Sequence, residues 1–144
     1  MKWLFPFLAL AGGAALGFQA VINGGLGKKV GTVEGAFISF AIGTLALFFV
    51  VVFFGKGNIS TVSEVPKWQL IGGLLGALYV FIMVLAVPKI GVAPTMVAII
   101  AGQLLIGAVI DHFGLLGGKQ VPLDFKKIIA LMMLFGALYL YNQK

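Results

Sequence analysis

The sequence predicts an all-α membrane protein, a polytopic transmembrane bundle of five helices. Hydrophobic residues make up 61% of the 144 residues and charged residues only 10%, whereas a soluble domain carries about 25% charged residues. With a mean hydropathy of +1.14, the chain has too little polar surface to cover a water-soluble particle. Five apolar runs are long enough, or nearly so, to cross a bilayer, which takes about 20 residues of helix.

Hydropathy and the positions of the prolines predict five helices within one transmembrane domain that covers residues 1–144. We expect them near residues 3–22, 33–54, 68–87, 92–113 and 125–141. Pro6 and Pro94 fall in first turns, where the missing N–H costs little. Pro66, Pro88 and Pro122 fall in the breaks between runs. The first run also resembles a signal peptide, but its apolar stretch continues well past the small-residue site, so we expect it to remain as a helix.

Small residues recur four positions apart within the predicted helices. Residues at this spacing share one helix face and let two backbones approach closely. The stripes indicate a compact bundle with partner helices and say little about a substrate. The residues that we expect to pack helices are Gly13, Gly17, Gly35, Ser39, Gly43, Gly72 and Gly76.

The few charged residues are mostly basic. All ten basic residues are lysine, and the net charge is +6. The lysines fall between apolar runs without interleaved aromatics, so they indicate loop charge at the membrane surface and not nucleic-acid binding. If the N-terminus is inside, the cytoplasmic lysines are Lys2, Lys56, Lys67, Lys119, Lys126 and Lys127. The other side then holds Lys28, Lys29, Lys89 and Lys144. A bias of six to four permits insertion in both orientations.

A few polar residues lie inside or at the ends of the apolar runs, where they are costly and often functional. Gln19 and Asn23 share a face near the end of the first helix, and Glu34 begins the second after an expected loop at 24–31. Gln103, Gly107 and Asp111 share a stripe on the fourth helix. We predict a substrate or ion pathway that includes Gln19, Asn23, Glu34, Gln103, Asp111 and His112.

Each of these residues has a structural alternative. Glu34 fits an N3 position favoured by the helix dipole, with Gly31 as N-cap. Asp111 and His112 fit interfacial residues that close the fourth helix, and Asn23 fits a cap of the first helix before a glycine. Gln103, at mid-helix, either bridges two helices or faces a polar cavity.

Several classes of chemistry are absent from the sequence. The chain has no cysteine, which excludes a disulfide scaffold, a thiolate metal site and a cysteine nucleophile. It has one histidine and no H-E-x-x-H pattern, and the glycine-rich stretch 24–31 lacks the Walker order. We therefore expect no enzyme, no cofactor, no metal site and no use of ATP.

Four blocks of the sequence carry a family resemblance. They are residues 17–27, residues 68–79, residues 88–93 and, most specific, Ala101-Gly102-Gln103-Leu104 followed by Ile110-Asp111-His112-Phe113-Gly114. They resemble the YdcZ-like family, a five-helix branch of the drug/metabolite transporter superfamily. The resemblance implies a half-size, multi-pass protein of the bacterial inner membrane. It also implies that an antiparallel dimer would resemble the ten-helix inverted-repeat fold of larger relatives.

These observations together predict a secondary transporter or exporter of small metabolites or drug-like compounds. We expect it to act as an antiparallel homodimer, or with a paired homologous subunit, and to be proton-coupled. Inverting one protomer would bring its Asp111 beside Glu34 of the other, as a shared ionisable gate. The alternatives are a small ion channel of dual topology and a non-catalytic membrane subunit.

Overall fold

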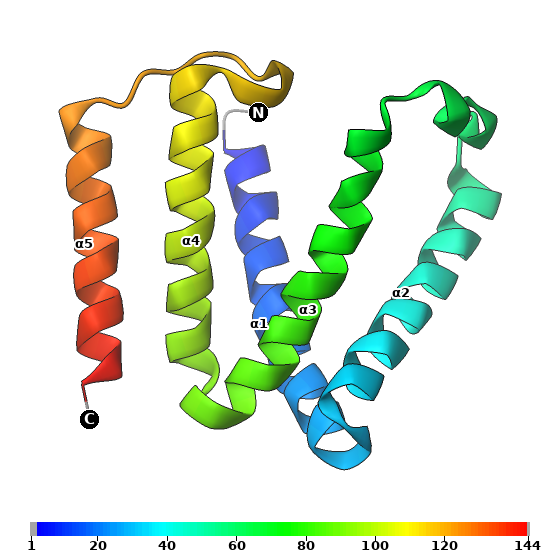
Figure 1. Cartoon of the computed structure of the whole chain (residues 1–144), viewed down its shortest axis with the longest axis horizontal. Helices are drawn as coiled ribbons and strands as arrows, with labels where there is room; N and C mark the ends of the chain where they lie inside the picture. Colours follow the sequence, from blue (N-terminus) through cyan, green and yellow to red (C-terminus); the bar gives the residue numbers. More distant parts are fainter. Residues whose placement is uncertain (1–2, 144) are drawn as a thin grey trace. The chain divides into compact units, whose positions relative to one another are not determined.

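The computed structural model describes residues 3–143, apart from the side chain of residue 142, and this part of the chain is helical throughout its regular structure (Figure 1). Its α-helices are α1 (Leu4–Val30), α2 (Thr32–Phe54), α3 (Ile71–Ile90), α4 (Val92–Phe113) and α5 (Phe125–Asn142). Short 3-10 turns cover Ile59–Glu64, Lys67–Leu70 and Leu115–Gly117. The predicted all-α transmembrane class is confirmed.

Length and composition identify four membrane-spanning candidates in the described residues. They are Leu4–Val30, Thr32–Phe54, Lys67–Ile90 and Val92–Phe113. The helix α5, with 18 residues, is the shortest of the five α-helices described. At 1.5 Å per residue it is about 27 Å long, close to the hydrocarbon thickness of a bilayer.

The glycine-rich stretch after residue 23 is helical, so the expected loop at 24–31 was wrong. Helix α1 continues to Val30, and only Gly31 separates it from α2. Glycine costs about 1 kcal/mol in a helix relative to alanine, but here the missing side chains let another helix approach. A Cβ on Gly24 would lie 3.2 Å from Cγ1 of Val87 on α3. Tertiary packing therefore overrides the local tendency of glycine to end a helix.

Two single glycines separate consecutive helices, Gly31 between α1 and α2 and Gly91 between α3 and α4. Gly31 has φ 107° and ψ 151°, and Gly91 has φ 92° and ψ 167°. Residues with a side chain rarely adopt this region. Gly31 donates its N–H to the carbonyl of Gly27 (3.0 Å) and accepts from the N–H of Gly35 (2.8 Å), so one residue ends α1 and begins α2. Pro88, expected in a break, instead lies in the last turn of α3, where two residues follow it before Gly91.

The chain forms two compact units, Met1–Lys89 and Ile90–Lys144. In the first unit, α1, α2 and α3 meet where α1 ends and α2 begins. A Cβ on Gly35 would lie 3.0 Å from Cα of Gly27, and a Cβ on Gly27 would collide with Cγ1 of Val84. The apolar core of this unit, made of Ala36, Val80 and Val84, lies at the same end. Residues 41–64, beyond this contact, are exposed throughout.

In the second unit, α4 and α5 lie side by side (Figure 1). Gly114, in the left-handed conformation, ends α4. The Asp124 side chain caps α5 by accepting the N–H of Lys127 (2.8 Å). The chain between these caps is fastened to the end of α4, because the Val121 N–H donates to the carbonyl of Asp111 (2.7 Å).

The seven predicted packing residues have different surroundings within one chain. Gly35 packs against α1, and a Cβ on Gly76 would lie 3.4 Å from the ring of Phe40. Apart from the local backbone of their own helices, no described atom lies within 4 Å of the corresponding position at Gly13, Gly17, Gly43 or Gly72. A role of these four in packing therefore requires other helices and stays a prediction.

The contact of Gly35 with Gly27 should be sensitive to a single methyl group. Gly35→Ala should lower the free energy of unfolding by about 1–3 kcal/mol, because the new Cβ meets backbone that cannot rotate away. The matched control is Gly12→Ala, which adds a methyl group where no described atom lies within 4 Å. Thermal unfolding in detergent would measure both variants. Equal stability of the two variants would contradict the close backbone contact.

Candidate functional site

A cavity of about 170 Å³ lies between α1 and α2. We call it the α1–α2 cavity, and its lining residues are Gln19, Ser39, Phe40, Gly43, Thr44 and Leu47. Gly43 is the middle residue of the 23-residue α2, and Gln19 lies two residues past Gly17, the middle of the 27-residue α1. The cavity is therefore at mid-height of two helices long enough to span a membrane.

The register of the two helices explains why these residues meet. Gly27 and Gly35 are in contact, and α1 and α2 run in opposite directions from the turn at Gly31. Moving eight residues back along α1 and eight forward along α2 brings Gln19 to the level of Gly43. Residues four apart lie on one helix face, so Ser39 and Gly43 continue the face that Gly35 presents to α1.

The α1–α2 cavity offers hydrogen bonds without charge. Its polar lining groups are the Gln19 amide and the hydroxyls of Ser39 and Thr44, each of which can both donate and accept. Phe40 and Leu47 supply apolar walls. The structure thus brings the predicted pathway residue Gln19 together with the predicted packing residues Ser39 and Gly43. Sequence reasoning missed Thr44, whose hydroxyl beside Gly43 in an apolar run was the available signal.

Asn23 lies one turn of helix from Gln19 and is buried, with 4% of its surface exposed. It belongs to the interior of α1, so its expected alternative as a helix cap was wrong. Its Nδ2 has no hydrogen-bond partner among the described residues. An unsatisfied buried polar group costs about 1–3 kcal/mol, so this amide favours any water or ligand oxygen that can reach it.

Glu34 occupies the third position of α2, after Gly31 as N-cap. Its carboxylate folds back over Gly31 into the space that a Cβ would fill there, and the side chain is exposed. A negative charge in the first turn is favoured by the helix dipole. Glu34 therefore has the geometry expected of an N3 residue that stabilises the start of α2, the structural alternative to a pathway role. Glu34 does not line the α1–α2 cavity.

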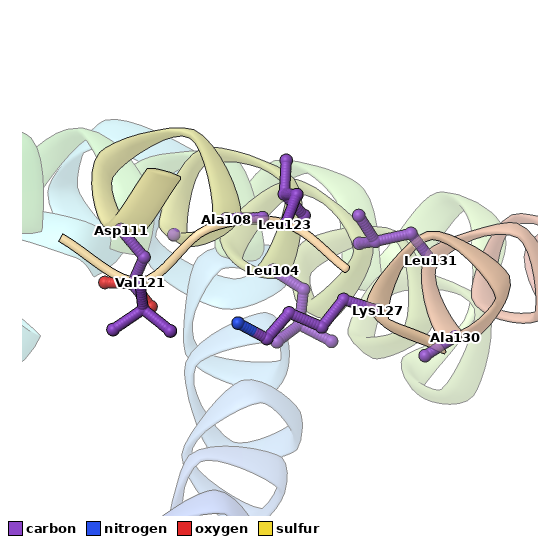
Figure 2. Close-up of a pocket in the computed structure, with 9 residues that line it drawn as sticks. Leu104, Ala108, Asp111, Val121, Leu123, Lys127, Ala130 and Leu131 are labelled. Atoms are coloured by element: carbon purple, nitrogen blue, oxygen red, sulfur yellow. The ribbon is translucent and has the colours of Figure 1, made fainter. Parts of the chain in front are cut away.

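A second and larger cavity, of about 270 Å³, lies between α4 and α5 (Figure 2). We call it the α4–α5 cavity, and its lining residues are Leu104, Gly107, Ala108, Asp111, Val121, Leu123, Lys127, Ala130 and Leu131. Asp111 and Gly107 of the predicted stripe line it. Gln103, in the middle of α4, is exposed and lines neither cavity.

Lys127 is the charged residue of this cavity that sequence reasoning missed. Its ammonium donates to the carbonyl of Pro122 (3.0 Å), which holds the side chain at the cavity rim. The signal lay in Asp124, an N-cap residue directly before an apolar run. That cap fixes where α5 begins and therefore which of the two neighbouring lysines faces α4.

His112 does not line either cavity but fastens the segment that does. Its Nδ1 accepts the N–H of Leu123 (3.1 Å), and its backbone carbonyl accepts from Nε2 of Gln120 (3.1 Å). The His112 ring packs edge-on against Phe113 at 4.8 Å between centroids. It acts here as a positioning residue for Leu123.

Comparison of the sequence with known proteins identifies its family. Residues 4–140 match the family model described as "Putative inner membrane exporter, YdcZ". A segment of 72 residues is 35% identical to the inner membrane protein YdcZ of Escherichia coli (strain K12). This alignment covers 48% of the present chain and 48% of the E. coli protein, about half the length of that curated relative. No solved structure matches the chain.

The hydrogen bond from the Leu123 N–H to His112 should stabilise the segment before α5. His112→Phe keeps an aromatic ring but removes the acceptor for the Leu123 N–H. Because one hydrogen bond contributes about 1 kcal/mol, hydrogen exchange of the Leu123 amide should become about five-fold faster. Lys119→Gln, an exposed change in the same segment, should leave this rate unchanged. An unaltered rate in His112→Phe would contradict the positioning role.

Proposed function

This chain belongs to the YdcZ family, and from that premise we propose that it is a secondary transporter that exports small molecules across the bacterial inner membrane. It is a multi-pass membrane protein, and its family supports a transporter and not an enzyme. The observation that carries the proposal is the α1–α2 cavity, because it places hydrogen-bonding groups midway along two membrane-spanning helices.

A polar side chain at mid-membrane costs free energy, so one that is found there usually has a function. Side chains such as Gln19 find no water in the hydrocarbon core, and substrate sites of secondary transporters lie near the bilayer midplane between helices. The uncharged lining suits a small molecule that presents hydroxyl, amide or carbonyl groups at one end and an apolar or aromatic part at the other. The lack of a Walker motif in the sequence supports gradient-driven transport over ATP hydrolysis.

The size of the cavity supports an assembly of two copies. Ligand pockets usually measure about 300–1,000 Å³, whereas the α1–α2 cavity of one chain measures about 170 Å³. A second chain facing it would enlarge the site and cover the small-residue positions Gly13 and Gly17, which no described residue outside their own helix approaches. With the weak lysine bias, we propose an antiparallel homodimer, or a pair with a homologous subunit.

Removing the amide of the cavity should impair export. In proteoliposomes loaded with a panel of small metabolites and cationic drugs, Gln19→Leu should lower the rate for the transported compound about 10-fold, from the loss of one or two hydrogen bonds. Gln103→Leu should have the same effect if the middle of α4 also lines the pathway.

The control for this measurement is Gln69→Leu, an exposed amide in the turn before α3 that lines neither cavity. It should transport like the unaltered protein. Full export by a folded Gln19→Leu protein would overturn the cavity as the site. Ion flux that neither saturates nor responds to a pH gradient would favour a channel.

The antiparallel arrangement makes a sharp prediction for cross-linking, because the chain has no cysteine of its own. Glu34 and Asp111, at opposite ends of their spans, are exposed in the single chain. A protomer with Glu34→Cys alone, mixed with one with Asp111→Cys alone, should form a disulfide-linked dimer under mild oxidation. If dimers are present and this pair does not form, the two acids do not share a gate.

A further inference from the structure

We propose that the α4–α5 cavity is a binding site for one phosphatidylethanolamine molecule, with the lipid ammonium at Asp111 and the lipid phosphate at Lys127. The apolar residues of the cavity would contact the upper part of the acyl chains. The site lies within the second unit of one chain, so the proposal does not depend on the transported substrate or on the dimer.

The position of the cavity along its helices matches that of a lipid headgroup. Asp111 lies two residues before the end of α4, and Lys127 is the third residue of α5. Both charges are therefore at the membrane face where α4 ends and α5 begins. Leu104 lies seven residues from Asp111, about 10 Å deeper along the helix. The lining thus changes from charged to apolar in the direction in which a lipid changes from headgroup to tail.

The two charges of the cavity remain available to a ligand. Hydrogen bonds to Asp111 in the described structure go to its backbone carbonyl, from Gly114 and Val121, and its carboxylate accepts none of them. Lys127 donates one hydrogen bond, to Pro122, and an ammonium has three N–H groups. The described residues show no ion pair between these two side chains, although both line the same cavity.

The arrangement of the lining is complementary to a zwitterion with a tail. Figure 2 shows the Lys127 ammonium and the Asp111 carboxylate toward the end of the cavity where Val121 lies, with Ala130 and Leu131 farther along it. A carboxylate recognises a primary ammonium, and a lysine recognises a phosphate, through charge-assisted hydrogen bonds. Phosphatidylethanolamine carries both groups on one headgroup, at the depth where the cavity lies.

Other membrane lipids satisfy only part of this lining. Phosphatidylglycerol has a phosphate but no cation for Asp111. Phosphatidylcholine has a cation without N–H groups, so it offers Asp111 no hydrogen bond. A soluble zwitterion such as phosphoethanolamine matches both charges but leaves Leu104 and Leu131 uncovered. The three compounds therefore separate the contributions of amine, charge and acyl chain.

The test is native mass spectrometry of the full chain, delipidated in detergent and titrated with dioleoyl lipids. The unaltered protein should retain one phosphatidylethanolamine, with an affinity about 10-fold above those for phosphatidylcholine and phosphatidylglycerol, from the added charge-assisted hydrogen bonds. Phosphoethanolamine in excess should not displace it. Equal binding of the three lipids would overturn the proposal. Displacement by phosphoethanolamine would instead assign the site to a soluble zwitterion.

Two variants assign the selectivity to the cavity. Asp111→Asn should abolish the preference for phosphatidylethanolamine over phosphatidylglycerol, and Lys127→Gln should weaken binding of all three lipids. The matched controls are Glu64→Gln and Lys126→Gln, which remove exposed charges outside the cavity and should retain the selectivity. Loss of selectivity in the controls would show general surface electrostatics and overturn the site. The headgroup comparison on the unaltered protein decides the proposal even if a variant does not fold.

Discussion

The close contact of α1 and α2 at Gly27 and Gly35, covered by Val84 of α3, fixes the first unit of this protein. A Cβ on Gly35 would lie 3.0 Å from Cα of Gly27, so the two backbones meet without side chains between them. Because the turn at Gly31 joins these helices directly, this contact sets their register over their full length. The α1–α2 cavity lies about two helical turns from this contact, at the level of Gln19 and Gly43.

The sequence predicted those parts of the fold that depend on local composition, and it failed where contacts between distant segments decide the structure. Hydropathy identified the five α-helices that the structure describes, because burial in lipid depends on composition over about 20 residues. It failed at residues 24–30, where local propensity indicates a loop and the helix persists because Gly24 and Gly27 pack against α3. It also failed at Pro88. Both errors concern residues whose local preference is opposed by contacts with another part of the chain.

The candidate sites were predictable only where helix spacing alone brings residues together. Of the six residues that line the α1–α2 cavity, the sequence predicted Gln19 as a pathway residue and Ser39 and Gly43 as helix-packing residues. Lys127 could not be found in this way. Its place in the α4–α5 cavity depends on the turn that the Asp124 cap begins and that His112 and Asp111 hold against α4. A lysine at a membrane surface is otherwise most simply interpreted as loop charge.

The two cavities differ in the polarity of their lining groups and in their position along the helices. The α1–α2 cavity at mid-height has an amide and hydroxyls, whereas the α4–α5 cavity near the helix ends has a carboxylate and an ammonium. This follows from the cost of charge in hydrocarbon, which falls toward the interface where water and headgroups are available. In the proposed transporter, the acids Glu34 and Asp111 therefore lie at the ends of the spans and not beside a substrate at Gln19. Coupling between them would require a change in helix packing that both sites bias. The glycine contact joins Glu34 to Gln19 through the shared register of α1 and α2, so a shift there would move both residues together.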